Sequence, residues 1–129
     1  MNKTMFIGRL TSAPEISKTT ADKSYVRVTL AVNRRFKNEK GEREADFSSI
    51  LIWGKSAETL VSYAKKGSLI SIEGEIRTRN YMDKQNQKHY VTKILGLSYD
   101  LLESRATIAL RESAIKTEET LLDAEELPF

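Results

Sequence analysis

Hydrophobic and polar residues alternate along most of the chain up to about residue 103. The clearest run is SYVRVTLAVNRR, whose apolar positions are Val26, Val28, Leu30 and Val32. A two-residue period is typical of a β-strand that buries one face. The runs KTMFIGRL, ADFSSILIWG, SLISIEGEIRTRNY and HYVTKILGLSYDLL have the same character, and polar loops such as KNEKGE and DKQNQK separate them. The pattern therefore predicts five strands.

One segment, SAETLVSYAKKG, has a helical period instead. A single apolar stripe runs along it at Ala57, Leu60, Val61 and Ala64. Ser56 is expected to cap the helix N-terminus. Lys65 and Lys66 are expected in its last turn, with Gly67 just beyond the C-terminus. The helix lies between the third and fourth predicted strands.

Five strands with one helix in that position indicate an all-β domain, the OB-fold, which is a five-stranded Greek-key barrel. A small sandwich is the structural alternative. After Glu103 the alternation stops and no glycine follows, so the remainder is expected to be a polar tail. We expect an OB-fold domain over 1–103, a short polar linker over 104–122 and an acidic tip over 123–129.

The charge is distributed unevenly between these parts. Residues 1–103 hold 18 Lys and Arg against 12 Asp and Glu, whereas residues 104–129 hold 3 against 6. The net charge of +3 thus combines a body of +6 with a tail of −3. A basic body favours a polyanionic partner, although a solvated surface alone can carry such an excess.

Enzymatic chemistry finds little support in the residues. Cysteine is absent, His89 is the only histidine, and no glycine-rich phosphate motif occurs. A metal-dependent nuclease would need carboxylates that converge from different strands. The sequence alone does not exclude such a site, which could combine Glu42, Glu44 and Asp46 with Glu73 and Glu75. We expect no catalytic residue, no metal and no cofactor. No apolar run is long enough to cross a bilayer and no signal peptide is evident, so we expect a cytoplasmic location and no membrane partner.

Aromatic and basic residues occupy strand faces that the core does not claim. Phe47 and Trp53 alternate with Ile50 and Ile52, and Arg27 and Arg35 lie opposite the valines of their strand. On the next strand Arg77, Arg79 and Tyr81 share the face opposite Ile70, Ile72 and Ile76. Flat side chains for stacking, with cations along the backbone path, are what single-stranded nucleic acid requires. Phe47 and Trp53 could instead fill the end of the barrel or a subunit contact.

Several stretches also resemble bacterial single-stranded DNA-binding proteins, in a short-tailed form. They are MFIGRLTSAPE, LAVNRRF, ADFSSILIWGKSAETLVSYAKKGSLISIEGEIRTRNY and the final EELPF. The resemblance implies an OB-fold homotetramer, associated with the nucleoid, that wraps single-stranded DNA without strong sequence preference. It also implies that the protein is not an enzyme and needs no cofactor. It does not choose among replicative, competence-related, phage and plasmid forms.

By position, the resemblance implies stacking of DNA bases on Phe36, Phe47, Trp53 and Tyr81. It implies phosphate contacts for Lys55, Lys66, Arg77, Arg79, Arg34 and Arg35. Several family members carry tryptophan where this chain has Phe36, Phe47 and Tyr81, so the stacking area is smaller here. Strict alternation would place Phe36 with Val32 on the core side, unless the strand bends or ends after Arg35.

The acidic end is the second functional element that the resemblance implies. Its residues are Asp123, Glu125, Glu126, Leu127, Pro128 and Phe129. Such a tip would recruit replication, recombination and repair proteins. A partner with an apolar pocket beside a basic residue could take the ring and the terminal carboxylate of Phe129 together. The competing interpretations are an OB-fold RNA-binding protein and a primosome-type protein-interaction module.

Overall fold

The computed structural model describes residues 1–104 and 106–114. The strands are β1 (Thr4–Leu10), β2 (Ser17–Lys18), β3 (Ser24–Asn33), β4 (Ala45–Trp53), β5 (Leu69–Met82) and β6 (Lys88–Leu101). Helix α1 (Lys55–Tyr63) follows β4, and a second helical segment covers residues 106–114. All five predicted strands are present, and the short β2 is an addition that the alternation did not indicate.

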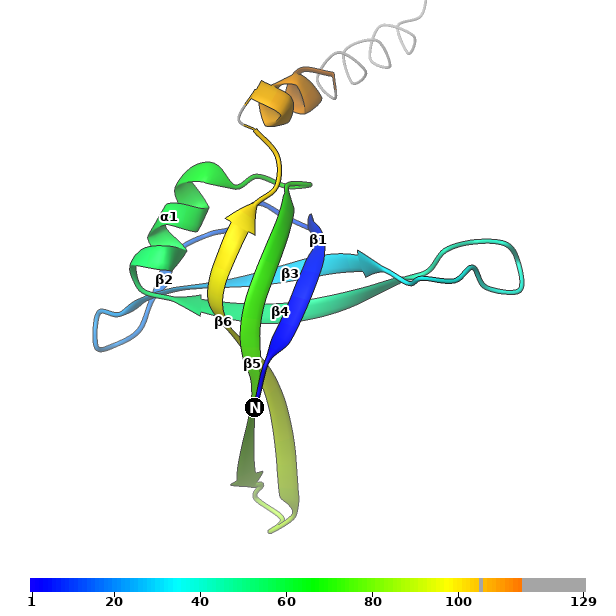
Figure 1. Cartoon of the computed structure of the whole chain (residues 1–129). Helices are drawn as coiled ribbons and strands as arrows, with labels where there is room; N and C mark the ends of the chain where they lie inside the picture. The colour runs from blue at the N-terminus through cyan, green and yellow to red at the C-terminus, as the bar shows by residue number, and fades with distance from the viewer. Residues whose placement is uncertain (105, 115–129) are drawn as a thin grey trace, which may run out of the picture.

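The strands form one closed sheet in the order β1-β5-β6-β4-β3-β2, and a further β1–β3 pairing closes the barrel. Most neighbours are antiparallel, whereas β4 and β6 run parallel where Ile50 lies beside Ile94. Figure 1 shows the β5–β6 hairpin extending well beyond the barrel, with α1 and residues 106–114 toward the opposite end. Six strands with one helix between β4 and β5 confirm the predicted all-β OB-fold class.

The core fills the barrel between its strands and α1. The alternation in β3 and β4 is confirmed, because Val26, Val28 and Leu30 are buried and so are Ile50 and Ile52. The helix contributes the apolar stripe predicted for it, with Val61 packed against the cluster from the side. The cluster consists of Leu10, Val26, Val28, Leu30, Ile50, Ile52, Ala57, Leu60, Ala64, Ile70 and Ile72.

The ends of α1 differ from the prediction. The helix begins at Lys55 with Gly54 as its N-cap, at a φ of 72° that favours glycine, and no side chain caps it. Ser56 is therefore inside the first turn. At the other end Ala64 is already extended, and its buried side chain joins the core. Lys65 and Lys66 consequently lie in the connection to β5 rather than in the last turn.

The first part of strand β5 belongs to the barrel and its second part projects from it. Ile70 and Ile72 are buried in the barrel, whereas Ile76, predicted on the same side, is exposed because the strand has left the core. A register shift at Glu73 and Gly74 marks the change, where Glu73 pairs with Ser98 and Gly74 with Gly96. Beyond it, β5 pairs only with β6, so the two strands form a projecting arm from residue 77 to residue 93.

No helix within residues 1–104 or 106–114 is both long and apolar enough to cross a membrane.

Candidate nucleic-acid interface

The outer face of β3 and β4 forms the first part of the candidate interface. Phe47 is 68% exposed and Trp53 is 40% exposed, and both lie outside the buried cluster. The antiparallel register sets Trp53 opposite Tyr25 and Phe47 opposite Ala31. Since side chains alternate between the two faces of a strand, burial of Ile50 and Ile52 turns both rings outward. Neither ring therefore fills the barrel.

Tyr25 belongs to this face although the sequence did not single it out. Its ring centroid lies 5.3 Å from that of Trp53, with the ring planes tilted by 44°. Tyr25 is two residues from Arg27 on β3, so the strand period could have indicated it. Tyr25 thus packs against one side of the Trp53 ring, and the ring remains partly exposed to solvent.

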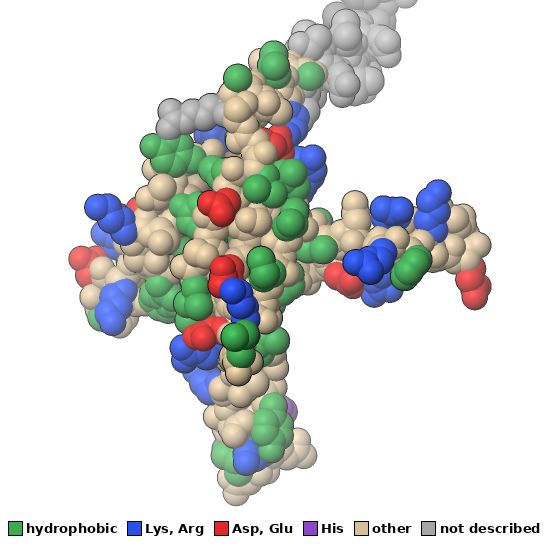
Figure 2. All heavy atoms as spheres, in the orientation of Figure 1, with side chains coloured by type: hydrophobic (Ala, Val, Ile, Leu, Met, Phe, Trp, Pro, Cys, Tyr) green, Lys and Arg blue, Asp and Glu red, His purple; other side chains and the backbone are tan. Residues whose placement is uncertain are grey.

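Phe36 lies just beyond β3, which ends at Asn33. The alternation therefore stops before Phe36, and its side chain is 79% exposed rather than on the core side. The conflict between strand phase and resemblance is thus resolved by the early end of the strand. Figure 2 shows Lys and Arg side chains gathered on the segment that joins β3 to β4 and extends away from the barrel.

Arg34, next to this loop, is held by two carboxylates. Its Nε donates to both carboxylate oxygens of Asp46, at 3.1 and 3.2 Å, and its Nη1 donates to Glu44 at 3.0 Å. The hydrogen bond to Asp46 and the charges of both acids raise the pKa of Arg34. The same bond lowers the pKa of Asp46. Arg35 has no ion pair within residues 1–104 and 106–114.

The arm forms the second part of the interface. Arg77, Arg79 and Tyr81 alternate along β5 and pair with Lys93, Val91 and His89 of β6. Tyr81 is 45% exposed. The Nε of Arg77 donates to Glu75 at 2.7 Å, whereas Arg79 has no ion pair in the part of the chain that the structure describes.

A groove of about 210 Å³ lies beside the β3–β4 face, where that face meets β6. Its walls come from β3, β4 and β6, and they include Arg27, Leu51 and Lys93. Lys93 is the cross-strand neighbour of Arg77, so one wall of the groove belongs to the base of the arm. Arg27 and Lys93 thus add two cations between the predicted aromatic residues.

The two candidate lysines lie at opposite ends of α1. Lys55 is the first residue of the helix and follows Trp53 by two positions. Lys66 lies past the helix C-terminus, in the connection to β5. Both side chains are exposed, but only Lys55 is a sequence neighbour of the β3–β4 face.

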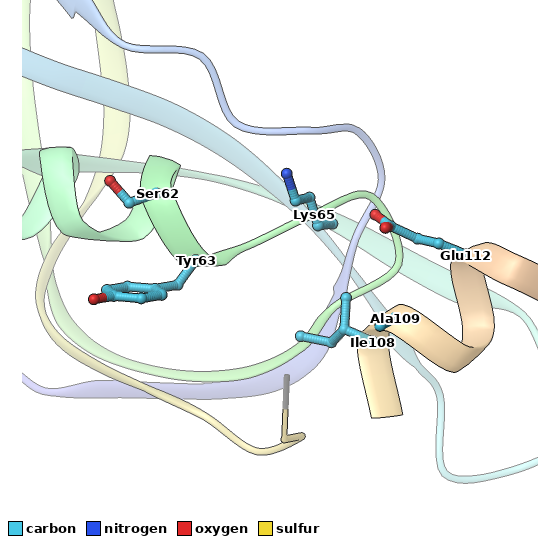
Figure 3. A pocket seen from close by; sticks show the side chains of 6 residues that line it. All are labelled: Ser62, Tyr63, Lys65, Ile108, Ala109 and Glu112. Atoms are coloured by element: carbon cyan, nitrogen blue, oxygen red, sulfur yellow. The ribbon is translucent and has the colours of Figure 1, made fainter. Parts of the chain in front are cut away.

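Residues 106–114 attach to the barrel away from this interface. The carboxylate of Glu103 accepts from the Leu69 amide at 3.0 Å and from Arg9 Nη1 at 2.8 Å, and it pairs with Arg111. Ile108 is buried. A pocket of about 310 Å³ lies between the end of α1 and this helical segment, with Tyr63, Lys65 and Ile108 among its lining residues. Figure 3 shows how these side chains lie.

The predicted tip falls outside the described residues, from Asp123 to Phe129. Among the residues that are described, no group of three His, Asp or Glu side chains is arranged to hold a metal ion. Glu42, Glu44 and Asp46 therefore do not converge with Glu73 and Glu75 into such a site. The described surface instead combines rings and cations, which can stack on flat groups and neutralise anions.

Known proteins share this sequence over most of its length. A single-stranded DNA-binding protein 1 of Streptococcus pyogenes is 58% identical over 130 aligned residues, which cover 99% of this chain and 98% of the relative. A single-stranded DNA-binding protein 2 of Streptococcus agalactiae is 56% identical with the same coverage. A longer relative in Streptococcus mutans, a single-stranded DNA-binding protein, is 48% identical over 107 residues, which cover 83% of this chain and 65% of the relative. The model of the single-strand binding protein family matches residues 1–102, and the chain therefore belongs to that family.

Proposed function

We propose that this protein binds single-stranded DNA without strong sequence preference, by stacking bases on exposed rings and contacting phosphates with nearby cations. The observation that carries the proposal is that Trp53, Phe47, Tyr81 and Phe36 are all at least 40% exposed. Relatives that match nearly the whole chain are named for the same ligand.

The rings account for tolerance of sequence. Every base has a π-face, and stacking one base on an aromatic side chain contributes about 1–3 kcal/mol whatever the base. Trp53 and Phe47 lie on one β-strand face, Phe36 lies beyond the end of β3, and Tyr81 lies on the arm. A strand that reached all four would have to bend around the barrel.

The cations account for attraction to the backbone. Arg27 and Lys93 line the groove between the β3–β4 face and the base of the arm, and Arg77 and Arg79 add positive charges along the arm. A single strand that passes through the groove would bring its phosphates to these side chains. Each phosphate neutralised releases condensed counter-ions, so binding should weaken as salt rises.

Trp53 provides the test because it is the only tryptophan. Oligo(dT) of increasing length should quench its fluorescence, with an affinity that falls as the salt concentration rises. An affinity that stays flat from low to high salt would exclude phosphate neutralisation. In competition, poly(dT) should displace poly(U); preference for poly(U) would replace the DNA proposal with RNA binding.

We further propose that the protein works in the cytoplasm at the nucleoid as a homotetramer that protects single strands. Met5 and Ile7 of β1 are exposed and border an apolar-lined groove of about 460 Å³, which supports contact with another copy. Mass measurement of the free protein tests the assembly, and a monomer at micromolar concentration would contradict it.

Recruitment of replication, recombination and repair proteins is assigned to the tip formed by residues 123–129. Burial of the Phe129 ring in a partner would contribute about 1.5–3 kcal/mol, enough for a weak and exchangeable contact. Deletion of Phe129 should leave oligo(dT) affinity intact and abolish capture of such partners. Loss of DNA affinity in this variant would contradict the division of roles.

A further inference from the structure

The ring of Tyr81 rests on a histidine. His89 lies directly opposite Tyr81 in the β5–β6 ladder, and the two ring centroids are 5.1 Å apart with planes only 17° from parallel. One face of Tyr81 is thus occupied by an imidazole, and the side chain remains 45% exposed. A base stacked on the other face would complete a column of three flat groups.

Asp83 holds the imidazole in place. Its Oδ2 lies 2.7 Å from His89 Nε2, while its Oδ1 accepts from the amides of Gln85 and Gln87 at 2.9 and 2.8 Å. One carboxylate therefore fixes both the turn of the arm and the plane of the histidine. The hydrogen bond from His89, followed by that from the Gln87 amide, lowers the pKa of Asp83.

Few other charges surround this pair. The register brings only β5, β6 and their connecting turn to His89, because β1 pairs with β5 no further out than Gly74. Lys84 and Lys88 belong to the turn and its end, and Arg79 is the next residue toward the barrel on the same face of β5. With His89 neutral, Asp83 is the one negative charge among them.

We propose that the Asp83–His89 pair is a proton-responsive support for Tyr81, and that protonation of His89 strengthens binding of single-stranded DNA at the arm. The proposal rests on the proposed function and identifies His89 and Asp83 as positioning residues for its stacking site. Imidazole is the side chain that ordinarily changes charge between about pH 5 and pH 8.

Two physical effects act in the same direction. A proton on His89 balances the charge of Asp83, so the end of the arm becomes more favourable for a phosphate backbone. It also turns the hydrogen bond between Nε2 and Oδ2, whose acceptor is already charged, into an ion pair in which both partners are charged. A ring held more firmly beneath Tyr81 leaves less conformational freedom to be lost when a base stacks.

The test compares oligo(dT) affinity at about pH 5.5 and about pH 8 at constant ionic strength, with Trp53 fluorescence as readout. Thymine does not titrate in this interval, so the response belongs to the protein. The wild type should bind about twofold to fivefold more tightly at the lower pH, the range expected for one exposed ion pair. His89→Phe retains a stacked ring but should bind with the same affinity at both pH values, because His89 is the only histidine.

For each variant, the affinity at the lower pH is divided by the affinity at the higher pH. This ratio is unaffected by a substitution that changes affinity equally at both pH values. Lys84→Gln removes a charge from the same turn but keeps His89, so its ratio should match that of the wild type. Asp83→Asn should reduce the ratio, because protonated imidazole loses its anionic partner. Equal ratios in the wild type and His89→Phe would overturn the proposal. Absence of binding at every pH would instead overturn the proposed function.

Discussion

Replacement of Phe47 by alanine tests whether this ring stacks on DNA bases or stabilises the fold. The ring lies on the outer face of β4 opposite Ala31, is 68% exposed and is not part of the core cluster. Its loss should therefore change the free energy of unfolding by no more than about 0.5 kcal/mol, as for other surface substitutions.

The cost in DNA binding should be larger. If one base stacks on Phe47, truncation removes about 1–3 kcal/mol of binding free energy. Since every 1.4 kcal/mol corresponds to a factor of ten, affinity for a short oligo(dT) should fall by about fivefold to 150-fold. Trp53 remains available as the fluorescent reporter, and urea unfolding of the same variant gives its stability.

Two controls define the interpretation. Phe47→Leu retains an apolar side chain but not a flat ring, so it should also weaken binding. Leu110→Ala removes a side chain of similar exposure, 73%, from the helical segment on the barrel, and should bind normally. The reasoning is refuted if Phe47→Ala binds like the wild type, or if it loses stability in proportion to its loss of affinity.

Three further predictions concern stability. Glu103→Ala should lower the free energy of unfolding by about 1–3 kcal/mol, because the Leu69 amide loses its acceptor, and should speed hydrogen exchange in residues 106–114. Gly74→Ala should lower the melting temperature at a cost of about 1–3 kcal/mol, since its new Cβ would lie 2.2 Å from a backbone oxygen; an unchanged melt would show that the register shift absorbs it. The lowered pKa of Asp83 should stabilise the fold above about pH 4, with the benefit lost as pH falls through that lowered pKa. The melting temperature of the wild type should therefore exceed that of Asp83→Asn at neutral pH and approach it in acid.

Strand phase was the most informative property of the sequence. Burial of alternate residues is a local rule, so the outward faces of Phe47, Trp53, Arg79 and Tyr81 could be predicted before any tertiary structure was known. The absence of enzymatic activity follows from membership of a family of DNA-binding proteins that do not catalyse reactions. Strict alternation wrongly placed Phe36 on the core side, because a two-residue period does not show where a strand ends.

Contacts between distant segments could not be predicted in this way. The stack of Tyr81 on His89 depends on the cross-strand register, and the attachment of Arg111 depends on Glu103 reaching the amide of Leu69. The predicted start of α1 was also wrong by two residues, because Gly54, with its positive φ, is the N-cap in place of the expected Ser56. Each of these features arises from backbone geometry rather than from residue type alone.

The ion pairs of Arg34 and Arg77 have a consequence for how the interface responds to salt. Both guanidinium groups carry internal counter-ions, Asp46 with Glu44 in one case and Glu75 in the other. A phosphate that takes the place of these carboxylates frees them to gather cations from solution, which offsets the cations that the DNA releases. Arg79, without such a partner in the described chain, provides no offset. If phosphates bind at these arginines, we expect the salt dependence of affinity to indicate fewer phosphate contacts than the protein makes, and part of the affinity for DNA to persist at high salt concentration.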